Sequence, residues 1–257
     1  QWILVGAVLL LAPATAGGNF SFPPPSPPEE YGNFLIRRGS VGQDIQAVSF
    51  SHWIHRQKHT CRVCHFELQF AMEANVTEIS EAANRAGMFC GACNDGTDRF
   101  GHTKEEDCEK CHNGDLRRGS EKFWGLYRLP QTRYGNQIDW VTALESGAIN
   151  PAHQLDDNPP QEMGFANVLE LESEWGDAVA SARFPHDTHT AWLDCSDCHP
   201  YIFNVKEKFT EGFRMASNIS GLFCGVCHTN VAFPMTDCIR CHPDMEDPEE
   251  YPEPESR

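Results

Sequence analysis

The residues most capable of chemistry in this sequence are cysteines and histidines that recur in one pattern. All twelve cysteines fall into six Cys-x-x-Cys pairs, and five pairs are followed directly by His. The pairs are Cys61/Cys64, Cys90/Cys93, Cys108/Cys111, Cys195/Cys198, Cys224/Cys227 and Cys238/Cys241, and the histidines are His65, His112, His199, His228 and His242. Cys-x-x-Cys-His is the attachment signature of c-type heme, in which two thiols bond the porphyrin and the His binds the iron. The sequence therefore predicts six covalent heme c groups, with Asn94 standing where one proximal His is expected.

Zinc sites and disulfides are the alternative explanations for paired cysteines. Zinc-binding pairs do not require a following His. Disulfide frameworks do not require closely spaced pairs. Only twelve residues of the chain are His, so chance does not account for five of them at this one position. Heme attachment is the interpretation that explains both the pairs and the histidines.

The pattern is duplicated along the chain. A Phe-x-His-x-x-His motif precedes the first attachment site of each repeat, at residues 50–55 and again at 184–189. The two repeats match at an offset of 134 positions, without a gap, from residue 50 to residue 93. Their third attachment sites are 130 positions apart, so the first repeat has four extra residues in the loop that holds His102. This predicts a duplicated module rather than a solenoid.

This spacing resembles the triheme cytochrome c7 branch of the cytochrome c3 family. The resemblance covers both repeats, about half of the chain, and implies two tandem triheme modules. In that family the first His of the motif is the distal ligand of the module's first heme, and the second reaches across to the next heme. The resemblance implies that His52 and His186 bind the hemes on Cys61/Cys64 and Cys195/Cys198, and that His55 and His189 bind the hemes on Cys90/Cys93 and Cys224/Cys227.

The sequence departs from the family pattern in two places. One is Asn94, and the other is the lack of a His just before the middle attachment site of either repeat, where the family has the distal ligand of its last heme. Six hemes with two His ligands each need twelve histidines, and after the nine above His59, His102 and His153 remain. Each of the three could instead be a surface residue.

His102 is the first candidate for the position that Asn94 leaves without an imidazole. It lies in the extra residues of the first repeat, eight positions after Asn94, and a loop of that length can turn back under the ring. His102 could instead bind the heme of His112, which would leave the heme on Cys90/Cys93 five-coordinate. Methionine is the competing ligand type. Met72, Met88, Met215 and Met235 lie near the attachment sites, although apolar packing is the more ordinary role for each.

These ligands must be positioned by a small amount of protein. With about 43 residues per heme, the porphyrins must supply most of the buried apolar surface. The expected fold is mostly irregular or loop structure with short α-helices and little sheet, in two tandem triheme modules wrapped around covalent hemes.

The chain divides by composition into six segments. We expect a signal peptide or N-terminal membrane anchor at 1–17, a Pro-rich extended spacer at 18–47, module 1 at 48–117, an aromatic-rich connecting segment at 118–181, module 2 at 182–245 and an acidic disordered tail at 246–257. The apolar run 2–12 followed by Ala14-Thr15-Ala16 favours a cleaved signal peptide over an anchor. In the connecting segment, residues 139–145 are the best helical candidate, ending before Gly147.

The net charge of −17 argues against nucleic acid and anionic membrane surfaces as partners. Redox partner proteins, basic or neutral, fit better. We expect an extracytoplasmic electron carrier, in the periplasm, on the outer face of the membrane or outside the cell, rather than an enzyme. One alternative is a heme enzyme with an open iron at Cys90/Cys93. Another is self-association as a cytochrome filament, or a place in a membrane quinol-oxidising complex.

Overall fold

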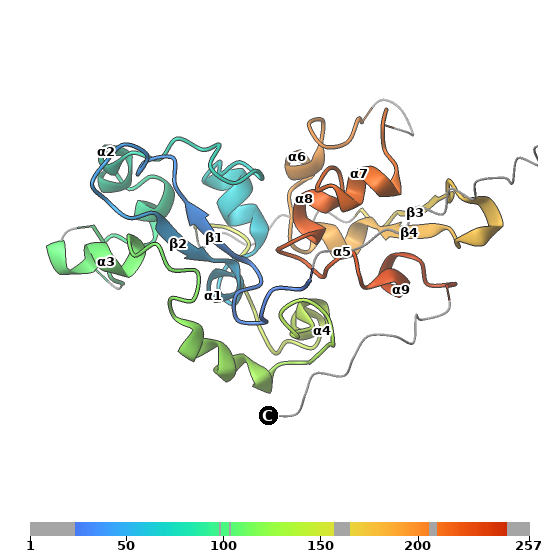
Figure 1. The fold of residues 1–257 in the computed structure, drawn as a ribbon, viewed down its shortest axis with the longest axis horizontal. Coiled ribbons are helices and arrows are strands. Elements are labelled where there is room, and N and C mark those ends of the chain that lie inside the picture. Colours follow the sequence, from blue (N-terminus) through green and yellow to red (C-terminus); the bar gives the residue numbers. More distant parts are fainter. Residues whose placement is uncertain (1–23, 98, 103, 157–164, 206–209, 246–257) are drawn as a thin grey trace, which may run out of the picture.

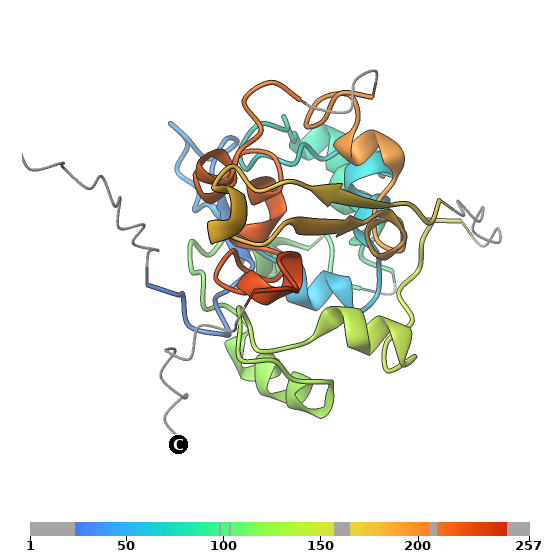
Figure 2. The same ribbon diagram turned by 90° about the vertical axis from the view of Figure 1, so that its right-hand side faces the viewer.

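The structure is a computed structural model that describes residues 24–97, 99–102, 104–156, 165–205 and 210–245. Short helices and two small strand pairs are joined by long loops (Figures 1 and 2), which confirms the predicted fold class. The predicted signal peptide or anchor and the acidic tail lie outside the described residues. Within those residues, no helix has both the length and the apolar character needed to cross a bilayer.

Each module is introduced by an antiparallel hairpin that runs directly into a short helix. In the first hairpin β1 (Asn33–Ile36) pairs with β2 (Val48–Ser51), and β2 leads into α1 (His52–Arg56). In the second, β3 (Val168–Leu171) pairs with β4 (Ala182–Pro185), and β4 leads into α5 (His186–Thr190). The strands β1 and β3 therefore lie within the segments expected to be a spacer and a connection.

The attachment sites coincide with single helical turns. These are a π-helical turn at Val63–Glu67, a 3₁₀ turn at Phe89–Ala92, α3 (Cys108–Cys111), α6 (Cys195–Cys198), α8 (Gly225–His228) and α9 (Cys238–Cys241). A further 3₁₀ turn, Glu105–Asp107, precedes α3. Residues three apart in a helical turn lie on one face. One turn is therefore sufficient to present both thiols of a pair to the same porphyrin.

The middle attachment site of each module is packed against a preceding helix in the same way. These helices are α2 (Glu81–Arg85) and α7 (Met215–Ile219). A Cβ added to Gly91 would lie 1.9 Å from the carbonyl oxygen of Asn84, and a Cβ on Gly225 would lie 1.9 Å from that of Asn218. Only glycine fits so close an approach of two backbones. The two glycines therefore fix the same local packing in both modules.

The connecting segment forms the main hydrophobic core. It contains a 3₁₀ helix at Ser120–Arg128, α4 (Trp140–Glu145) and a 3₁₀ turn at Gly176–Ala178. The helix predicted at 139–145 is confirmed, and the side chain of Asp139 caps it by accepting from the backbone N–H of Thr142 at 3.1 Å. The buried core residues are Trp53, Phe123, Leu126, Leu129, Ile138, Trp140, Ala143 and Ile149, with Ile54, Leu144 and Trp192 packed against them.

Three of these residues come from the modules. Trp53 and Ile54 belong to α1 of module 1, and Trp192 follows α5 of module 2. In Figure 1 the green and yellow-green connecting segment lies along the lower side of the molecule, between the two modules. The segment therefore contacts residues of both modules through an ordinary side-chain core.

Candidate heme-binding site

Nine histidines are held by the same hydrogen bond. In each, ring nitrogen Nδ1 donates to a main-chain carbonyl oxygen, which can only accept. The pairs are His52 to Gly32 (2.9 Å), His55 to Ser51 (2.8 Å), His65 to Phe70 (2.8 Å), His112 to Gln46 (3.1 Å), His186 to Asn167 (2.8 Å), His189 to Pro185 (2.8 Å), His199 to Phe203 (2.8 Å), His228 to Phe233 (2.9 Å) and His242 to Ala180 (2.7 Å). This bond fixes the tautomer and leaves the Nε2 lone pair for a metal, as is usual for metal-binding His. The nine are the five that follow a Cys-x-x-Cys pair and the four of the Phe-x-His-x-x-His motifs.

The hairpins supply several of these acceptors. The carbonyl of Gly32, just before β1, accepts from both the backbone N–H (3.0 Å) and the ring of His52. The carbonyl of Asn167, just before β3, accepts in the same two ways from His186, with the backbone bond again 3.0 Å. The first strand of each hairpin therefore orients the first histidine of the motif.

The phenylalanine of each motif fixes the second histidine. Phe50 stacks on His55 with ring centroids 4.5 Å apart and an interplanar angle of 22°. Phe184 stacks on His189 at 4.2 Å and 28°. Each Phe also meets the first His of its motif edge-on, at 4.9 Å in module 1 and 4.8 Å in module 2. Stacking explains why the motif begins with an aromatic residue.

One pair of histidines is already spaced as two ligands of one iron would be. The ring centroids of His189 and His228 lie 6.2 Å apart. Two imidazoles on opposite sides of one metal, with metal–nitrogen bonds of about 2 Å each, place their centroids about 6 Å apart. The two rings fit the axial positions of the heme on Cys224/Cys227.

Burial keeps these rings neutral. Desolvation lowers the pKa of His52 to about 3 and that of His228 to about 4, although the hydrogen bonds to Gly32 and Phe233 act in the opposite direction. Burial lowers the pKa of His55, His65 and His189 as well. A neutral imidazole is the form that binds a metal.

The cysteine pairs of module 1 follow one another in space. Burial, with a smaller effect of the neighbouring Cys61, Cys93 and Cys90, raises the pKa of Cys64 to about 12. Burial, with a smaller effect of Cys111, raises the pKa of Cys90 to about 11. The middle attachment site therefore lies close to both the first and the third.

The same order holds in module 2 and continues across to module 1. Burial raises the pKa of Cys224 to about 12, with Cys241 and Cys198 adding to it. Burial raises the pKa of Cys227 to about 12 as well, and the next contributors are Cys61 and Cys198. Because Cys61 belongs to module 1, the first attachment site of module 1 lies beside the first and middle sites of module 2. The six sites thus form one continuous series.

Sequence reasoning missed Arg56, which lies at this junction. Its Nη2 donates to the carbonyl of Val231 in module 2 at 3.0 Å. Its guanidinium carbon lies 5.2 Å from the ring centroid of Trp140 and 6.0 Å from that of Trp192. Burial lowers its pKa, while nearby Cys61 and Cys227 act to raise it. Nothing in the sequence distinguishes Arg56 from any other Arg at the end of a helix, so its contacts between the two modules could not be predicted.

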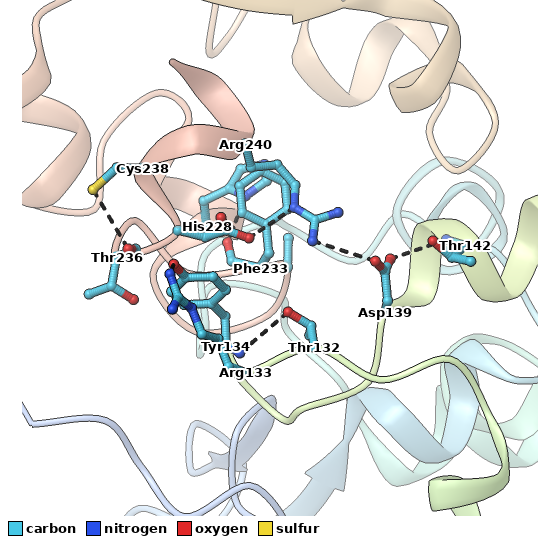
Figure 3. A network of polar contacts seen from close by, with 12 residues as sticks. Thr132, Arg133, Tyr134, Asp139, Thr142, His228, Phe233, Thr236, Cys238 and Arg240 are labelled. Atoms are coloured by element: carbon cyan, nitrogen blue, oxygen red, sulfur yellow. Dashed lines mark hydrogen bonds and ion pairs between the residues drawn. The ribbon is translucent and has the colours of Figure 1, made fainter. Parts of the chain in front are cut away.

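A second polar network ties α9 to the connecting segment (Figure 3). Arg240 lies between the two cysteines of the last attachment site, and its guanidinium pairs with Asp237 at 2.9 Å and with Asp139 at 3.5 Å. The same guanidinium lies 5.2 Å from the ring centroid of Phe233, whose carbonyl accepts from His228. Module 1 has the equivalent contacts in Lys110, which pairs with Asp107 at 2.5 Å and lies 5.4 Å from the ring of Phe100.

The structure places the remaining histidines differently. Both ring nitrogens of His59 are buried without a hydrogen-bond partner. The backbone of His59 is paired with Ala152, and the neighbouring His153 accepts from Arg62 through its carbonyl at 2.9 Å. His102 follows Gly101 in the loop of the extra residues, and it lies near Asp95, whose pKa is lowered mainly by hydrogen bonds from Thr97 and further by His102. A ligand role for these three histidines stays a prediction.

The protein part of the modules lacks the core that a domain of this size needs. Among the described residues of module 2, no hydrophobic side chain is fully buried, and in module 1 only Trp53 and Val63 are. A module of this length without a buried apolar core does not fold alone. None of the twelve cysteines, all of which lie in described segments, forms a disulfide. Covalent heme supplies the missing apolar surface, so the residues present fit that cofactor.

Comparison with known protein families places both repeats in one family. The family model described as "Cytochrome c7 and related cytochrome c" matches residues 48–113 and 182–243. No curated protein matches the sequence.

Solved structures that match come from the dodecaheme cytochrome c GSU1996. Its C-terminal hexaheme fragment is 26% identical, over 82% of this chain and 94% of that chain, with a TM-score of 0.25. The dodecaheme protein itself is 23% identical, over 79% and 72%, with a TM-score of 0.29. Its N-terminal hexaheme fragment is 21% identical, over 83% and 99%, with a TM-score of 0.26.

The cysteine pairs, the oriented histidines and the loop-rich fold define a multiheme c-type cytochrome, which binds heme c and transfers electrons through it. Within that class, this chain carries two cytochrome c7-like modules, one at each region that the family model matches.

Proposed function

We propose that this chain is an extracytoplasmic hexaheme electron carrier that passes electrons along one row of hemes between redox partner proteins. The observation that carries the proposal is the shared hydrogen bond of the nine histidines. Each presents Nε2 for iron, and together they account for nine of the twelve axial positions of six hemes. The other three are the proximal position at Asn94 and the distal positions at Cys108/Cys111 and Cys238/Cys241. We assign His65, His112, His199, His228 and His242 as proximal ligands and His52, His55, His186 and His189 as distal ligands.

The series of attachment sites supports conduction through the whole chain. Electron tunnelling weakens steeply with the distance between heme edges, so carriers that must relay electrons keep their hemes close. The thiols of Cys61, Cys198 and Cys227 lie near one another across the module boundary. An electron that enters at the third site of module 1 can therefore cross to the third site of module 2 without leaving the protein.

Charge supports the choice of partner. The chain carries a formal charge of −17 before heme propionates are counted, so a basic or neutral redox protein is the favoured partner. Electrostatic attraction of this kind raises association rates and is weakened by salt. Covalent heme attachment takes place outside the cytoplasm, which supports an extracytoplasmic location. Two axial imidazoles on an iron leave no position for a substrate, which supports a carrier rather than an enzyme at those hemes.

The experiment that tests the proposal is a count of hemes together with a redox titration. We expect the intact mass and the pyridine hemochrome absorbance to give six hemes per chain. We also expect reversible titration of all six, with no change in the protein after repeated cycles. A Cys90→Ser/Cys93→Ser double variant should lose one heme. Five hemes in the wild-type protein would mean that Cys90 and Cys93 remain unmodified, and the hexaheme assignment would be wrong.

A further inference from the structure

Asn94 takes the same position in module 1 that the heme-binding histidine His228 takes in module 2. The side-chain nitrogen of Asn94, Nδ2, donates to the carbonyl of Phe100 at 3.3 Å. The ring nitrogen of His228, Nδ1, donates to the carbonyl of Phe233 at 2.9 Å. Both Phe residues also carry a basic side chain over their rings, Lys110 in module 1 and Arg240 in module 2.

The backbone that leads to the two positions is alike. Phe89 and Phe223, before the two cysteine pairs, have φ values of 49° and 50°. Gly91 and Gly225 approach the carbonyls of Asn84 and Asn218 equally closely. The turns themselves differ, 3₁₀ at Phe89–Ala92 and α-helical at Gly225–His228, but the backbone N–H of Asn94 donates to Cys90 (2.9 Å) as that of His228 donates to Cys224 (3.0 Å). Asn94 and His228 therefore occupy equivalent places after their cysteine pairs.

Asn94 keeps the hydrogen-bond donor of a histidine and lacks the atom that binds iron. An amide N–H replaces Nδ1–H as the donor to the loop carbonyl, so the loop is held as in module 2. A carboxamide lacks the two outer ring atoms, Cε1 and Nε2, and Nε2 is the atom that binds iron. The remaining oxygen of Asn94 cannot reach the place of Nε2. On the opposite side His55 is fixed by Phe50 as His189 is fixed by Phe184.

We propose that the heme on Cys90/Cys93 has His55 as its one protein ligand and an open axial position on the Asn94 side that binds a small molecule. This inference rests on the proposed heme at Cys90/Cys93 and adds a ligand-binding site to the electron carrier. The adjacent hemes would exchange electrons with that iron, and binding itself needs no electron or proton.

The size of the position defines the ligand class. The space gained over module 2 is that of two ring atoms, which suits a molecule of two or three non-hydrogen atoms. The predicted ligand is thus a small molecule that donates a lone pair to iron.

The loop that holds His102 folds back on Asn94 before His102 is reached. A Cβ on Gly101 would lie 2.3 Å from the backbone nitrogen of Gly96 and 2.8 Å from the carbonyl oxygen of Asn94. The N–H of Gly101 donates to Asp107 at 3.4 Å, so the chain is already directed toward the third attachment site. Unlike the nine histidines, His102 is not oriented by a hydrogen bond from its ring to a main-chain carbonyl of the described residues.

A reciprocal exchange tests the proposal with a readout that is independent of activity. Carbon monoxide bound per chain is measured on the reduced protein, and the high-spin fraction is measured on the oxidised protein. Asn94→His should bind one carbon monoxide fewer than wild type and lose high-spin signal corresponding to one heme. His228→Asn, the matched control, should bind one more and gain the same signal. Because each substitution installs the residue that the other module already accommodates, both variants should fold.

Three outcomes would overturn the proposal. The first is unchanged carbon monoxide binding in Asn94→His. The second is a gain of one carbon monoxide in His102→Ala or His59→Ala that disappears when the Cys90→Ser/Cys93→Ser change removes this heme, because a histidine would then already fill the position. The third is no gain in His228→Asn, because the two positions would not be equivalent. Heme content is measured on every sample: five hemes would contradict the hexaheme function itself, whereas six hemes with unchanged ligand binding would contradict only the open position.

Discussion

At the scale of single residues, the histidines fall into two groups: those whose Nδ1 donates to a main-chain carbonyl and those without such a bond. The nine that donate to a main-chain carbonyl are oriented before any metal is bound, because the acceptors lie in the hairpins or in the loops beside the attachment sites. Hydrogen bonds that orient a metal-binding histidine in this way typically account for a 10- to 100-fold difference in metal affinity. His59 lacks such a bond, and both of its ring nitrogens are buried. Leu193 is its counterpart in module 2, so a role for the His59 ring would belong to module 1 alone.

The distal assignment can be tested at His189, where the geometry is clearest. His189→Ala removes one of two imidazoles whose centroids are 6.2 Å apart, and leaves His228 as the single ligand. We expect one heme per chain to change from low-spin to high-spin and to bind carbon monoxide, while heme content stays at six. Thr190→Ala, one residue later at the end of α5, should leave the spectrum as it is. An unchanged spectrum in His189→Ala would exclude His189 as a ligand.

At the scale of elements, each middle attachment site depends on contact between a short helix and the following turn. Neither α2 nor α7 exceeds five residues, and helices this short are not stable alone. They are held by packing, and Gly91 and Gly225 permit the approach. Both modules use the same glycine against the carbonyl of an Asn, so the contact is part of the duplicated unit.

Alanine at these glycines should therefore destabilise the module. In Gly225→Ala the new Cβ would lie 1.9 Å from the oxygen of Asn218, so α7 and α8 must separate. Overpacking of this kind costs about 1–3 kcal/mol of unfolding free energy, which denaturant titration followed by heme absorbance would measure. Gly91→Ala should lower the unfolding free energy of module 1 by a similar amount. Gly125→Ala, which meets nothing within 4 Å, is the control and should be neutral or slightly stabilising. Equal stability of Gly225→Ala and Gly125→Ala would contradict the close packing.

The sequence predicted the parts of the site that chemistry requires and missed those that packing supplies. Cysteine pairs and the Phe-x-His-x-x-His motif are visible because heme attachment demands those residue types at that spacing. The helix at 139–145 was also predictable, since Asp139 and Gly147 are ordinary end signals. The strands β1 and β3 were not predicted, because four residues give too short a pattern to separate strand from loop. The carbonyl acceptors of the nine histidines were not predictable either, since any residue provides a carbonyl.

At the scale of the whole molecule, two modules are held together by few but buried contacts. The connecting segment packs Trp53 of module 1 and Trp192 of module 2 into one core. Beside it, Tyr31 donates from its hydroxyl to the carbonyl of Ala232 at 2.7 Å, and Arg56 donates to the adjacent Val231. These bonds fix the loop that follows His228 against module 1. They therefore also set how close the first attachment site of module 1 lies to module 2.

Arg56 is the residue by which this arrangement can be tested. Arg56→Met keeps the length of the side chain but leaves the carbonyl of Val231 without its donor and removes the cation–π contact to Trp140. An unpaired buried carbonyl costs about 1–3 kcal/mol; because this bond is partly buried, we expect a loss of unfolding free energy at the lower end of that range. Faster proteolysis of the connecting segment and slower electron exchange between the modules should accompany it. Heme content should stay at six.

Arg183→Met is the control, because Arg183 pairs with Asp244 at an exposed site where ion pairs contribute about 0–1 kcal/mol.

The double variant Arg56→Met/Tyr31→Phe tests whether both hydrogen bonds hold the same loop against module 1. Tyr31→Phe removes the neighbouring bond to Ala232, and because Ala232 and Val231 are consecutive, the two changes loosen the same loop. Residues that share one contact region are not additive, with interaction energies of about 0.5–3 kcal/mol. We therefore expect Arg56→Met/Tyr31→Phe to lose less stability than the sum of the single variants, and to slow electron exchange little more than Arg56→Met does. If the two losses add in full, or if the single variants leave electron exchange between the modules unchanged, then the loop at 231–232 does not set the distance across which the modules exchange electrons.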